Sequence, residues 1–277
     1  MTLVDPSAIC SDVPRSCGQY MLRKVARGIV GALGLNGAGP LATEIVQAAR
    51  PVAILDTDHG PLLFRAGHGR IVWHVRSFYE EEPETVAWLD SMQPGDTLWD
   101  VGANIGKYAI YAASRGVQAF AFEPEPQNFA LLAENVELNG LDNCTPVMAA
   151  LFDSIGFGRI EAPYLTKAGA YNQFAGKRGP MVYGTTLDAL SLRFPAPDHL
   201  KIDVDGRERE ILRGGPGVLS KVKSLLIELN RATDGDLPER IEAAGLVKVS
   251  ERSNWEYRTD RTREAECPTV NVLYRRP

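Results

Sequence analysis

Residues 98–108 constrain the fold of this chain more than any other part of its sequence. An apolar run leads into Asp100 and Val101, Gly102 and Gly106 bracket a short turn, and apolar residues then recur at helical spacing. Glycine lets a backbone approach a ligand closely and adopts dihedral angles that other residues resist. The helix that follows directs its free N–H groups toward the same point. The stretch predicts a buried strand, a tight turn and a helix that meet at a ligand.

A second apolar run, residues 118–122, ends at Glu123 and Pro124. An acidic residue at the end of the second strand, about 20 residues beyond a glycine turn, can accept hydrogen bonds from both hydroxyls of a ribose. Together with the glycine turn, this residue predicts a pocket for an adenosine-type cofactor.

The spacing of the turn bears on the identity of that cofactor. Dinucleotide-binding turns follow the pattern G-x-G-x-x-G, whereas this turn has Gly102, Asn104 and Gly106 and no third glycine placed for a pyrophosphate. Asp100 would repel a phosphate and attract an ammonium group. S-adenosylmethionine, with adenosine at one end and an amino acid at the other, therefore fits better than a nicotinamide cofactor. The alternatives are a nicotinamide-dependent oxidoreductase and an ordinary turn without a ligand.

Composition narrows the class of protein. The chain has 277 residues, 44% of them hydrophobic, and a net charge of −5 without a basic block, which argues against nucleic acid as a partner. Its four cysteines include no C-x-x-C pair, no run approaches a membrane span, and the first residues do not resemble a secretory signal. We therefore expect a cytoplasmic protein that forms one large domain or one domain with an N-terminal extension.

Strands and helices alternate through the second part of the chain. Beyond those already named, the pattern predicts helices at residues 85–92, 127–138, 208–212 and 237–244, and strands at residues 144–149, 199–204, 224–229, 246–250 and 270–274. This alternation predicts an α/β fold with a mostly parallel sheet, covered on both faces, and an antiparallel hairpin at one edge. Residues 155–185 interrupt the pattern and either cover a site or form a loose loop.

The N-terminal part of the chain is harder to interpret. It predicts helices at residues 20–33 and 43–49 and short strands at residues 52–55, 62–65 and 69–75. The first helix would pack on its own core or on a second copy of the chain, and its alternative role is a lid or docking surface. His59, His68 and His74 fall in this region, but their spacing does not favour a metal site. Glu82 and Thr85 either cap the helix that follows or lie over the cofactor.

Charged residues follow the two strands expected to end beside the glycine turn. Lys201 and Asp203 share one face of the first strand, and Glu228 ends the second. Methyl transfer to an alcohol benefits from a base within hydrogen-bond reach, for which Asp203 is the first candidate and Glu228 the second. A magnesium ion held by Asp203, Asp205 and Glu228 is a less favoured alternative. The simplest alternative is that Lys201 only compensates the charge of these carboxylates.

Several further blocks occur in order along the chain. They are Glu82-Pro83-Glu84-Thr85, Trp99-Asp100-Val101-Gly102-Ala103-Asn104-Ile105-Gly106, Phe120-Ala121-Phe122-Glu123-Pro124-Glu125, Thr186-Leu187-Asp188, Lys201-Ile202-Asp203-Val204-Asp205-Gly206, Ile211-Leu212-Arg213-Gly214 and Asn271-Val272-Leu273-Tyr274. With these blocks the chain resembles the FkbM family of S-adenosylmethionine-dependent methyltransferases. The resemblance runs from about Phe78 to Tyr274 and implies a class I, Rossmann-like sheet of seven strands. It divides the chain into an N-terminal extension over residues 1–77 and an S-adenosylmethionine-binding methyltransferase domain over residues 78–277. It also implies O-methylation of sugars, polyketides or other natural products, or of carboxylates in some members.

The resemblance also implies roles for individual residues. The cofactor-binding residues would be Glu82, Thr85, Asp100, Gly102, Ala103, Asn104, Gly106, Glu123, Pro124, Asn128, Ala150, Leu151 and Asp203. The block 201–206 would face a small-molecule acceptor, although the family more often has Glu at the position of Asp205. A homodimer and a catalytically silent cofactor-binding partner protein are further expectations that the sequence leaves open.

Overall fold

The structure is a computed structural model that describes residue 31 and residues 50–66, 69–161, 173–174, 179–204, 206–253 and 269–277. The chain divides into two compact units, Met1–Arg50 and Pro51–Pro277, and the elements described below belong to the second. The helices expected at residues 20–33 and 43–49 lie outside the described residues, apart from residue 31. Across the described ranges, every helix is too short or too polar to cross a bilayer.

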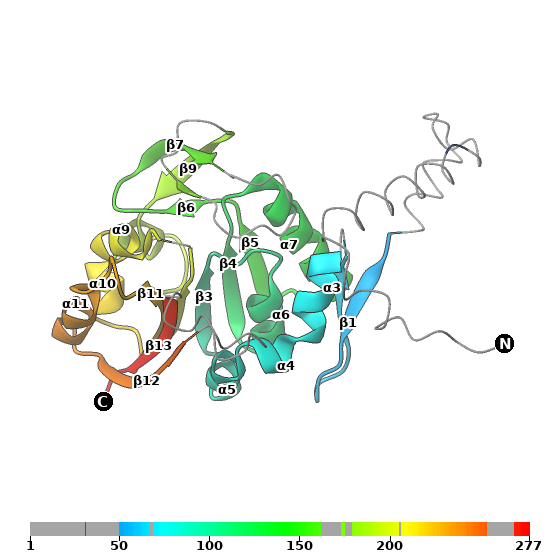
Figure 1. Ribbon diagram of the computed structural model, residues 1–277, viewed down its shortest axis with the longest axis horizontal. Coiled ribbons are helices and arrows are strands. Elements are labelled where there is room, and N and C mark those ends of the chain that lie inside the picture. Colours follow the sequence, from blue (N-terminus) through cyan, green and yellow to red (C-terminus); the bar gives the residue numbers. More distant parts are fainter. Residues whose placement is uncertain are drawn as a thin grey trace, which may run out of the picture. The chain divides into compact units, whose positions relative to one another are not determined.

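A seven-stranded sheet in the order β12-β13-β11-β10-β3-β4-β5 forms the middle of the second unit (Figure 1). Its strands are β3 (Thr97–Val101), β4 (Gln118–Phe122), β5 (Cys144–Val147), β10 (His199–Ile202), β11 (Ser224–Asn230), β12 (Val247–Ser253) and β13 (Thr269–Arg275). The strands from β5 to β11 are parallel, and β13 runs antiparallel to both β11 and β12. The expected sheet and its antiparallel edge are confirmed. The strand order reverses between β3 and β10, which is where open α/β sheets bind ligands.

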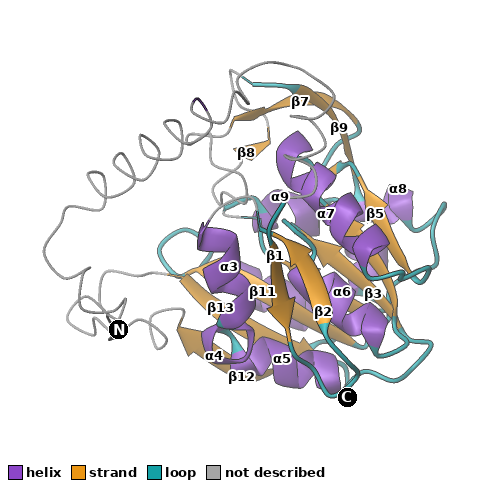
Figure 2. Cartoon of the chain, turned by 90° about the vertical axis from the view of Figure 1, so that its right-hand side faces the viewer, coloured by secondary structure: helices purple, strands orange, loops and turns teal. Residues whose placement is uncertain are grey.

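Helices cover both faces of the sheet, as the two views in Figures 1 and 2 show. The helices whose apolar residues share a core with one face are α3 (Gly69–Arg76), α4 (Phe78–Glu81), α5 (Pro83–Asp90), α6 (Lys107–Ser114) and α7 (Pro126–Leu138). Those on the other face are α8 (Leu187–Leu190), α9 (Glu208–Arg213), α10 (Pro216–Leu219) and α11 (Leu237–Ala243). Both cores are needed because strand side chains alternate: Leu98 packs into the first core, Trp99 and Val101 into the second.

A hairpin precedes this fold and packs against it. Strands β1 (Val52–Leu55) and β2 (Leu62–Arg65) pair antiparallel, as the sequence predicts. The side-chain oxygen of Asn135 on α7 accepts a hydrogen bond from the backbone N–H of Arg65 (2.7 Å), and that of Asn139, the C-cap of the same helix, accepts one from the N–H of Leu63 (2.8 Å). These backbone N–H groups on the outer edge of β2 therefore bond to asparagine side chains rather than to another strand.

The strand expected at residues 69–75 is wrong, because these residues form the helix α3. Ile71, Val75 and Phe78 are fully buried, whereas Trp73 is exposed. Their spacing of four and three residues is helical, and this face packs on β1 and α4. A short apolar run does not by itself distinguish a strand from a helix, and the packing partner decided the outcome.

Four short strands between residues 150 and 185 form a small separate sheet in the order β6-β9-β7-β8 above the main one (Figure 1). Its strands are β6 (Ala150–Leu151), β7 (Gly156–Glu161), β8 (Gln173–Phe174) and β9 (Met181–Thr185). Ile160 and Val182 on its inner face are buried with Ala150, whereas Phe157 and Tyr183 on its outer face are exposed. The described part of this insertion is therefore a cover with its own small core.

Candidate active site

The turn between β3 and α6 folds as its glycines predict. Gly102 (φ +84°), Asn104 (φ +52°) and Gly106 (φ +87°) all lie in the left-handed region of the backbone. Gly102 is also confined in space, since a Cβ at this position would overlap the carbonyl oxygen of Asp203. The turn thus packs directly against the end of β10.

Glu123 ties this turn to the end of β4. Its side chain is buried, Oε2 accepts a hydrogen bond from Asn104 N and Oε1 accepts one from Glu125 N, both at 2.8 Å. Each carboxylate oxygen keeps a second lone pair, so the group can still accept hydrogen bonds from ribose hydroxyls. Burial raises the pKa of Glu123 to about 7, although the two amides favour the ionised form.

A pocket opens beside these residues at the ends of β3 and β4. Four of the predicted cofactor-binding residues line it: Gly102, Pro124, Ala150 and Leu151. The remaining lining is mostly apolar: Val101, Phe122, Ala149, Ile160, Val204 and Arg207. Asn128 lies buried in the first turn of α7, outside this lining. The pocket has a volume of only about 30 Å³, far less than a nucleoside needs, so it is the chemistry of its lining that matches a nucleoside: an apolar wall for the base next to a carboxylate for the ribose hydroxyls.

The surroundings of Asp100 show whether the amino-acid end of the cofactor would fit next to this pocket. Its side chain is fully buried at the end of β3, and neither carboxylate oxygen makes a hydrogen bond of ordinary geometry; Asn104 Oδ1 is buried and unpaired as well. The Lys201 ammonium lies 3.9 Å from Asp100 Oδ1. Burial raises the pKa of Asp100, and Lys201 opposes that shift without cancelling it. Buried acceptors without donors fit a ligand that carries an ammonium group.

Lys201 and Asp203 meet at the carboxyl end of β10. Lys201 Nζ donates a hydrogen bond of 2.8 Å to Asp203 Oδ2, and the lysine side chain is buried whereas the aspartate is partly exposed. Burial alone would lower the pKa of Lys201, but the carboxylates of Asp203, Asp100 and Glu82 raise it above its usual value. Three carboxylates around one ammonium leave an excess of negative charge, which suits a cationic ligand and opposes a pyrophosphate.

Glu82 and Thr85 belong to the same surroundings. Glu82 is the residue before α5, but its side chain makes no capping hydrogen bond to the helix; instead Thr85 Oγ1 donates to Glu82 Oε2 at 2.8 Å. Burial raises the pKa of Glu82 against the opposing charges of Lys201 and Lys107. The geometry favours the interpretation in which these residues face the cofactor over the one in which they only cap a helix.

Glu228 lies on β11, next to β10 and on the same face as Lys201, and its backbone pairs in register with Asn271. Asp205 and His68 lie outside the described residues. Within the described ranges, no group of three or more His, Cys, Asp or Glu side chains is placed to hold a metal ion. His59 contacts Arg115 and His74 contacts Glu81, so the two described histidines of the N-terminal region have separate partners.

The structure adds residues that sequence reasoning missed. Tyr108 on α6 is buried over Lys201, with the ammonium 5.0 Å from the ring centre, and its hydroxyl makes no hydrogen bond of ordinary geometry. Val204 and Arg207 line the pocket, and the Glu208 carboxylate is buried behind them. For Val204, Arg207 and Glu208, the only signal in the sequence was their position soon after Lys201 and Asp203.

Comparison with known proteins assigns this site to a family. A family model described as "Methyltransferase FkbM domain" matches residues 100–245, more than half of the chain. The chain belongs to the FkbM methyltransferase family. It is therefore an S-adenosylmethionine-dependent methyltransferase, and the predicted family and fold class are confirmed.

Three curated relatives illustrate the range of this family's neighbours. The hexuronic acid methyltransferase AglP of Haloferax volcanii is 30% identical over 166 residues, which are 59% of this chain and 68% of AglP. The 31-O-demethyl-FK506 methyltransferase FkbM of Streptomyces tacrolimicus is 48% identical over 46 residues, 16% of this chain and 18% of that enzyme. A tRNA (guanine(37)-N(1))-methyltransferase of Leishmania major is 38% identical over 78 residues, 28% of this chain but only 11% of that enzyme.

Solved structures with a similar fold are more distant in sequence. M. capricolum TrmK, solved in complex with S-adenosyl-homocysteine, is 13% identical with a TM-score of 0.45, over 70% of this chain and 67% of that one. Precorrin-6y C5,15-methyltransferase from Geobacter metallireducens GS-15 is 19% identical with a TM-score of 0.41, over 70% of this chain and 86% of that one. The strand order and the family define the fold of this chain, not these likenesses.

Proposed function

We propose that this methyltransferase transfers a methyl group to a hydroxyl oxygen of a small molecule, either a sugar or a natural product with sugar-like hydroxyls. The observation that carries the proposal is the pair formed by Lys201 and Asp203, 2.8 Å apart at the carboxyl end of β10 and next to Gly102. The names of two relatives support this acceptor class, because one acts on a hexuronic acid and the other on 31-O-demethyl-FK506.

In this proposal the cofactor spans the ends of β3 and β4. The residues that would hold its amino-acid end are Asp100, Gly102, Ala103, Asn104, Gly106, Glu82 and Thr85. Glu123 and Pro124 would hold the ribose, and Asn128, Ala150 and Leu151 would lie near the adenine. When bound, S-adenosylmethionine supplies an electrophilic methyl group on a sulfonium.

Asp203 is the proposed base. A neutral hydroxyl is a poor nucleophile, and a positioned base contributes about 10²–10⁴-fold to such a reaction. The Asp203 carboxylate would accept a hydrogen bond from the acceptor hydroxyl and take its proton as the new C–O bond forms. Lys201 orients that carboxylate, and Glu228, on the same face of the sheet, would contact a second hydroxyl of the acceptor.

The charges near the site favour a hydroxyl over a carboxylate as the acceptor. Asp100, Asp203 and Glu82 raise the pKa of Lys201, and Lys107 is a second cation that acts on Asp100 and Glu82. A further carboxylate would therefore meet three carboxyl groups and two cations. Like charges in a partly desolvated site repel one another strongly. The second candidate is methylation of a carboxyl group, and the observation in its favour is the acidic sugar in the name of AglP.

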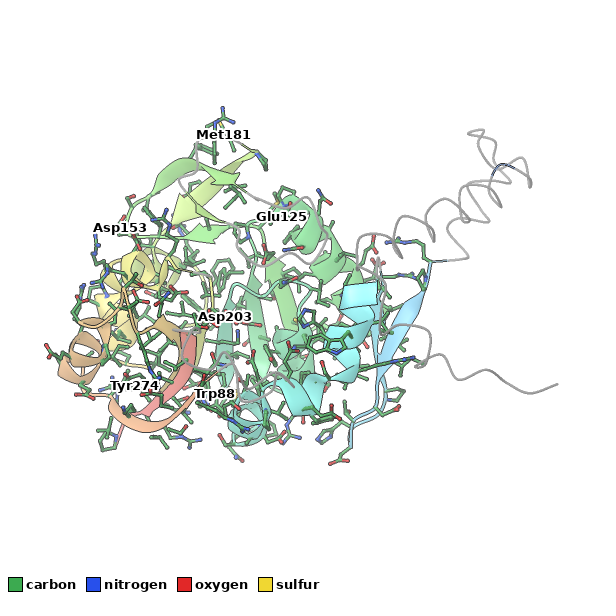
Figure 3. The ribbon with its side chains drawn as sticks, viewed as in Figure 1. Trp88, Glu125, Asp153, Met181, Asp203 and Tyr274 are labelled. Atoms are coloured by element: carbon green, nitrogen blue, oxygen red, sulfur yellow. The ribbon has the colours of Figure 1, made fainter. Side chains whose placement is uncertain are left out.

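Calorimetry with S-adenosylhomocysteine tests the cofactor, and methyl transfer to a panel of neutral sugars and uronic acids tests the acceptor. We expect Asp203→Asn to lower kcat for a hydroxyl acceptor by about 10²–10⁴-fold, because the base is lost. Asp153→Asn is the matched control, since Asp153 is similarly exposed but pairs with Arg213, 3.3 Å away. Figure 3 labels both aspartates.

Each alternative has its own outcome in these experiments. Transfer to a uronic acid that survives Asp203→Asn would contradict the hydroxyl proposal, because a carboxylate needs no base. Cofactor binding without turnover on any acceptor would support a silent partner protein. Loss of activity with EDTA and its recovery with Mg²⁺ would revive the metal alternative with Asp203, Asp205 and Glu228.

A further inference from the structure

The loop between β10 and α9, which begins at Asp203, belongs to both halves of the site. Asp203 carries the carboxylate that pairs with Lys201, and its carbonyl oxygen packs against Gly102 of the cofactor turn. Val204 and Arg207, further along the same loop, line the pocket next to Glu123. A change in the conformation of this loop would therefore alter the acceptor side and the cofactor side together.

One buried carboxylate holds this loop. Glu208 is 2% exposed, and its Oε1 accepts hydrogen bonds from the backbone N–H groups of Val204 and Gly206, each at 3.2 Å. Burial raises the pKa of Glu208 to about 7. The backbone N–H groups of Glu208 itself, Gly206 and Val204 oppose this shift, and Asp203 adds to it. Burying a carboxylate is unfavourable, so a carboxylate bonded to loop amides points to a requirement for that loop conformation.

These bonds come in addition to a cap of the helix, since the carboxylate also accepts a hydrogen bond from the backbone N–H of Glu208 itself, at the start of α9. A capping side chain accepts hydrogen bonds from N–H groups of the helix that it begins. Glu208 is the first residue of α9, and its side chain reaches back to amides that precede the helix. The bonds stabilise the loop before α9.

We propose that Glu208 is a positioning residue of this methyltransferase. It holds the backbone at Val204 and Gly206 so that Asp203 is directed at the acceptor and Val204 forms part of the wall of the cofactor pocket. One side chain thereby sets the relative position of the two reactants, which in-line methyl transfer requires to within a fraction of an ångström. The part of this inference that concerns the acceptor rests on the proposed function. The part that concerns the cofactor pocket does not.

Two substitutions at this position separate hydrogen bonding from charge. Glu208→Ala removes the acceptor that the backbone N–H groups of the half-buried Val204 and the exposed Gly206 share. Glu208→Gln keeps a carbonyl oxygen of the same reach. Glu239→Ala is the matched control, because Glu239 is an exposed acid in the first turn of α11.

Three measurements report on these full-length variants: S-adenosylhomocysteine affinity by calorimetry, exchange of the Val204 and Gly206 amide protons by NMR, and kcat at saturating cofactor. For Glu208→Ala we expect affinity to fall by about tenfold, kcat to fall by about tenfold or more, and both amides to exchange faster. Glu208→Gln should restore all three to within about threefold of the wild type. Glu239→Ala should change none of them.

Other outcomes would overturn the inference. One is a Glu208→Ala protein that binds the cofactor like the wild type with unchanged amide exchange. Another is an equal loss of thermal stability in the Ala and Gln variants with affinity and kcat retained, which would indicate a structural role alone. If Glu208→Ala does not fold, Glu208→Asp replaces it, since its carboxylate is too short to reach both amides. A wild type that binds the cofactor but methylates nothing would sink the proposed function, while affinity and amide exchange would still test Glu208.

Discussion

Single carboxylates lie at both ends of the proposed cofactor site, and their surroundings differ. Asp100 is buried without hydrogen bonds of ordinary geometry, and the Lys201 ammonium lies 3.9 Å from its Oδ1, so it can still accept from a ligand that carries an ammonium group. Glu123 already accepts two backbone amides, and a pKa of about 7 leaves it partly protonated at neutral pH. The two residues therefore differ in how pH should affect the ligand groups that they would bind.

Binding of S-adenosylhomocysteine should release a proton near neutral pH. Ribose hydroxyls donate hydrogen bonds to the ionised form of Glu123, so affinity should rise by about tenfold between pH 6 and pH 8. In the free protein the folded pKa lies above the unfolded one, so Glu123 lowers stability as pH rises from about 4.5 to about 7. Calorimetry in two buffers of different ionisation enthalpy measures the proton.

Glu123→Gln should weaken binding and reduce the dependence on pH. Glu137→Gln is the matched control, because Glu137 is an exposed acid in the last turn of α7, away from this carboxylate. A wild-type affinity that does not change between pH 6 and pH 8 would contradict the role of Glu123. A pH dependence that survives in Glu123→Gln would instead implicate Glu208, whose pKa is also about 7.

At the scale of secondary-structure elements, the site depends on close packing of the turn after β3 against the end of β10. The backbone N–H of Asp203 donates to the carbonyl of Val101 at 3.0 Å, which extends the parallel pairing of the two strands by one residue. Gly102 follows Val101 and leaves no room for a side chain. The turn and the loop that carries Asp203 should therefore move as one.

Gly102→Ala should separate these two elements. The substitution combines a positive φ, which costs a side-chain-bearing residue about 1–2 kcal/mol, with a steric overlap against backbone. We expect a loss of several kcal/mol in the free energy of unfolding, measured with denaturant, and a loss of cofactor binding. Gly60→Ala controls for the dihedral angle alone, because Gly60 has φ +107° and open space around its Cβ position. Equal effects of the two substitutions would contradict the packing argument.

At the scale of the whole molecule, a buried hydrogen-bond network and the candidate active site lie at opposite ends of the sheet. Where β3, β10 and β11 begin, Trp88 Nε1 donates to Ser224 Oγ at 2.7 Å, and His199 lies 2.8 Å from Ser224 Oγ and 3.1 Å from Asp96. Ser224 and His199 are buried, and burial lowers the pKa of His199 against the pull of Asp96. In Figure 3, Trp88 lies below Asp203, toward the end of the sheet away from the small upper sheet.

Ser224→Ala should destabilise the protein without weakening the cofactor site. It would leave Trp88 Nε1 and one nitrogen of His199 unpaired, at about 1–3 kcal/mol in the free energy of unfolding. The affinity for S-adenosylhomocysteine should stay within about twofold, because ligands bind at the carboxyl ends of the strands. Ser220→Ala is the control, since Ser220 Oγ makes one exposed hydrogen bond, to Gly217. A parallel loss of affinity would contradict this separation.

The local pattern of the sequence determined the alternation of strands and helices, the glycine turn and the acidic strand ends. These features depend on residues that are near one another in the chain, so the apolar period and the turn residues are sufficient to predict them. The positions of Asp100, Gly102, Glu123, Lys201 and Asp203 at one end of the sheet follow from the rule for parallel strands. Their separate roles in binding and catalysis stay predictions.

Contacts between distant segments decided the rest. Residues 69–76 are a helix because β1 offers a surface to one helical face, and the small sheet over the pocket forms because β7 and β9 pair across an insertion. The fold brings backbone amides to Glu208 and a lysine to Tyr108, and neither contact could be predicted from the sequence. A sequence pattern records periodicity along the chain, whereas burial and hydrogen-bond partners depend on which surfaces meet, and only the tertiary structure determines those.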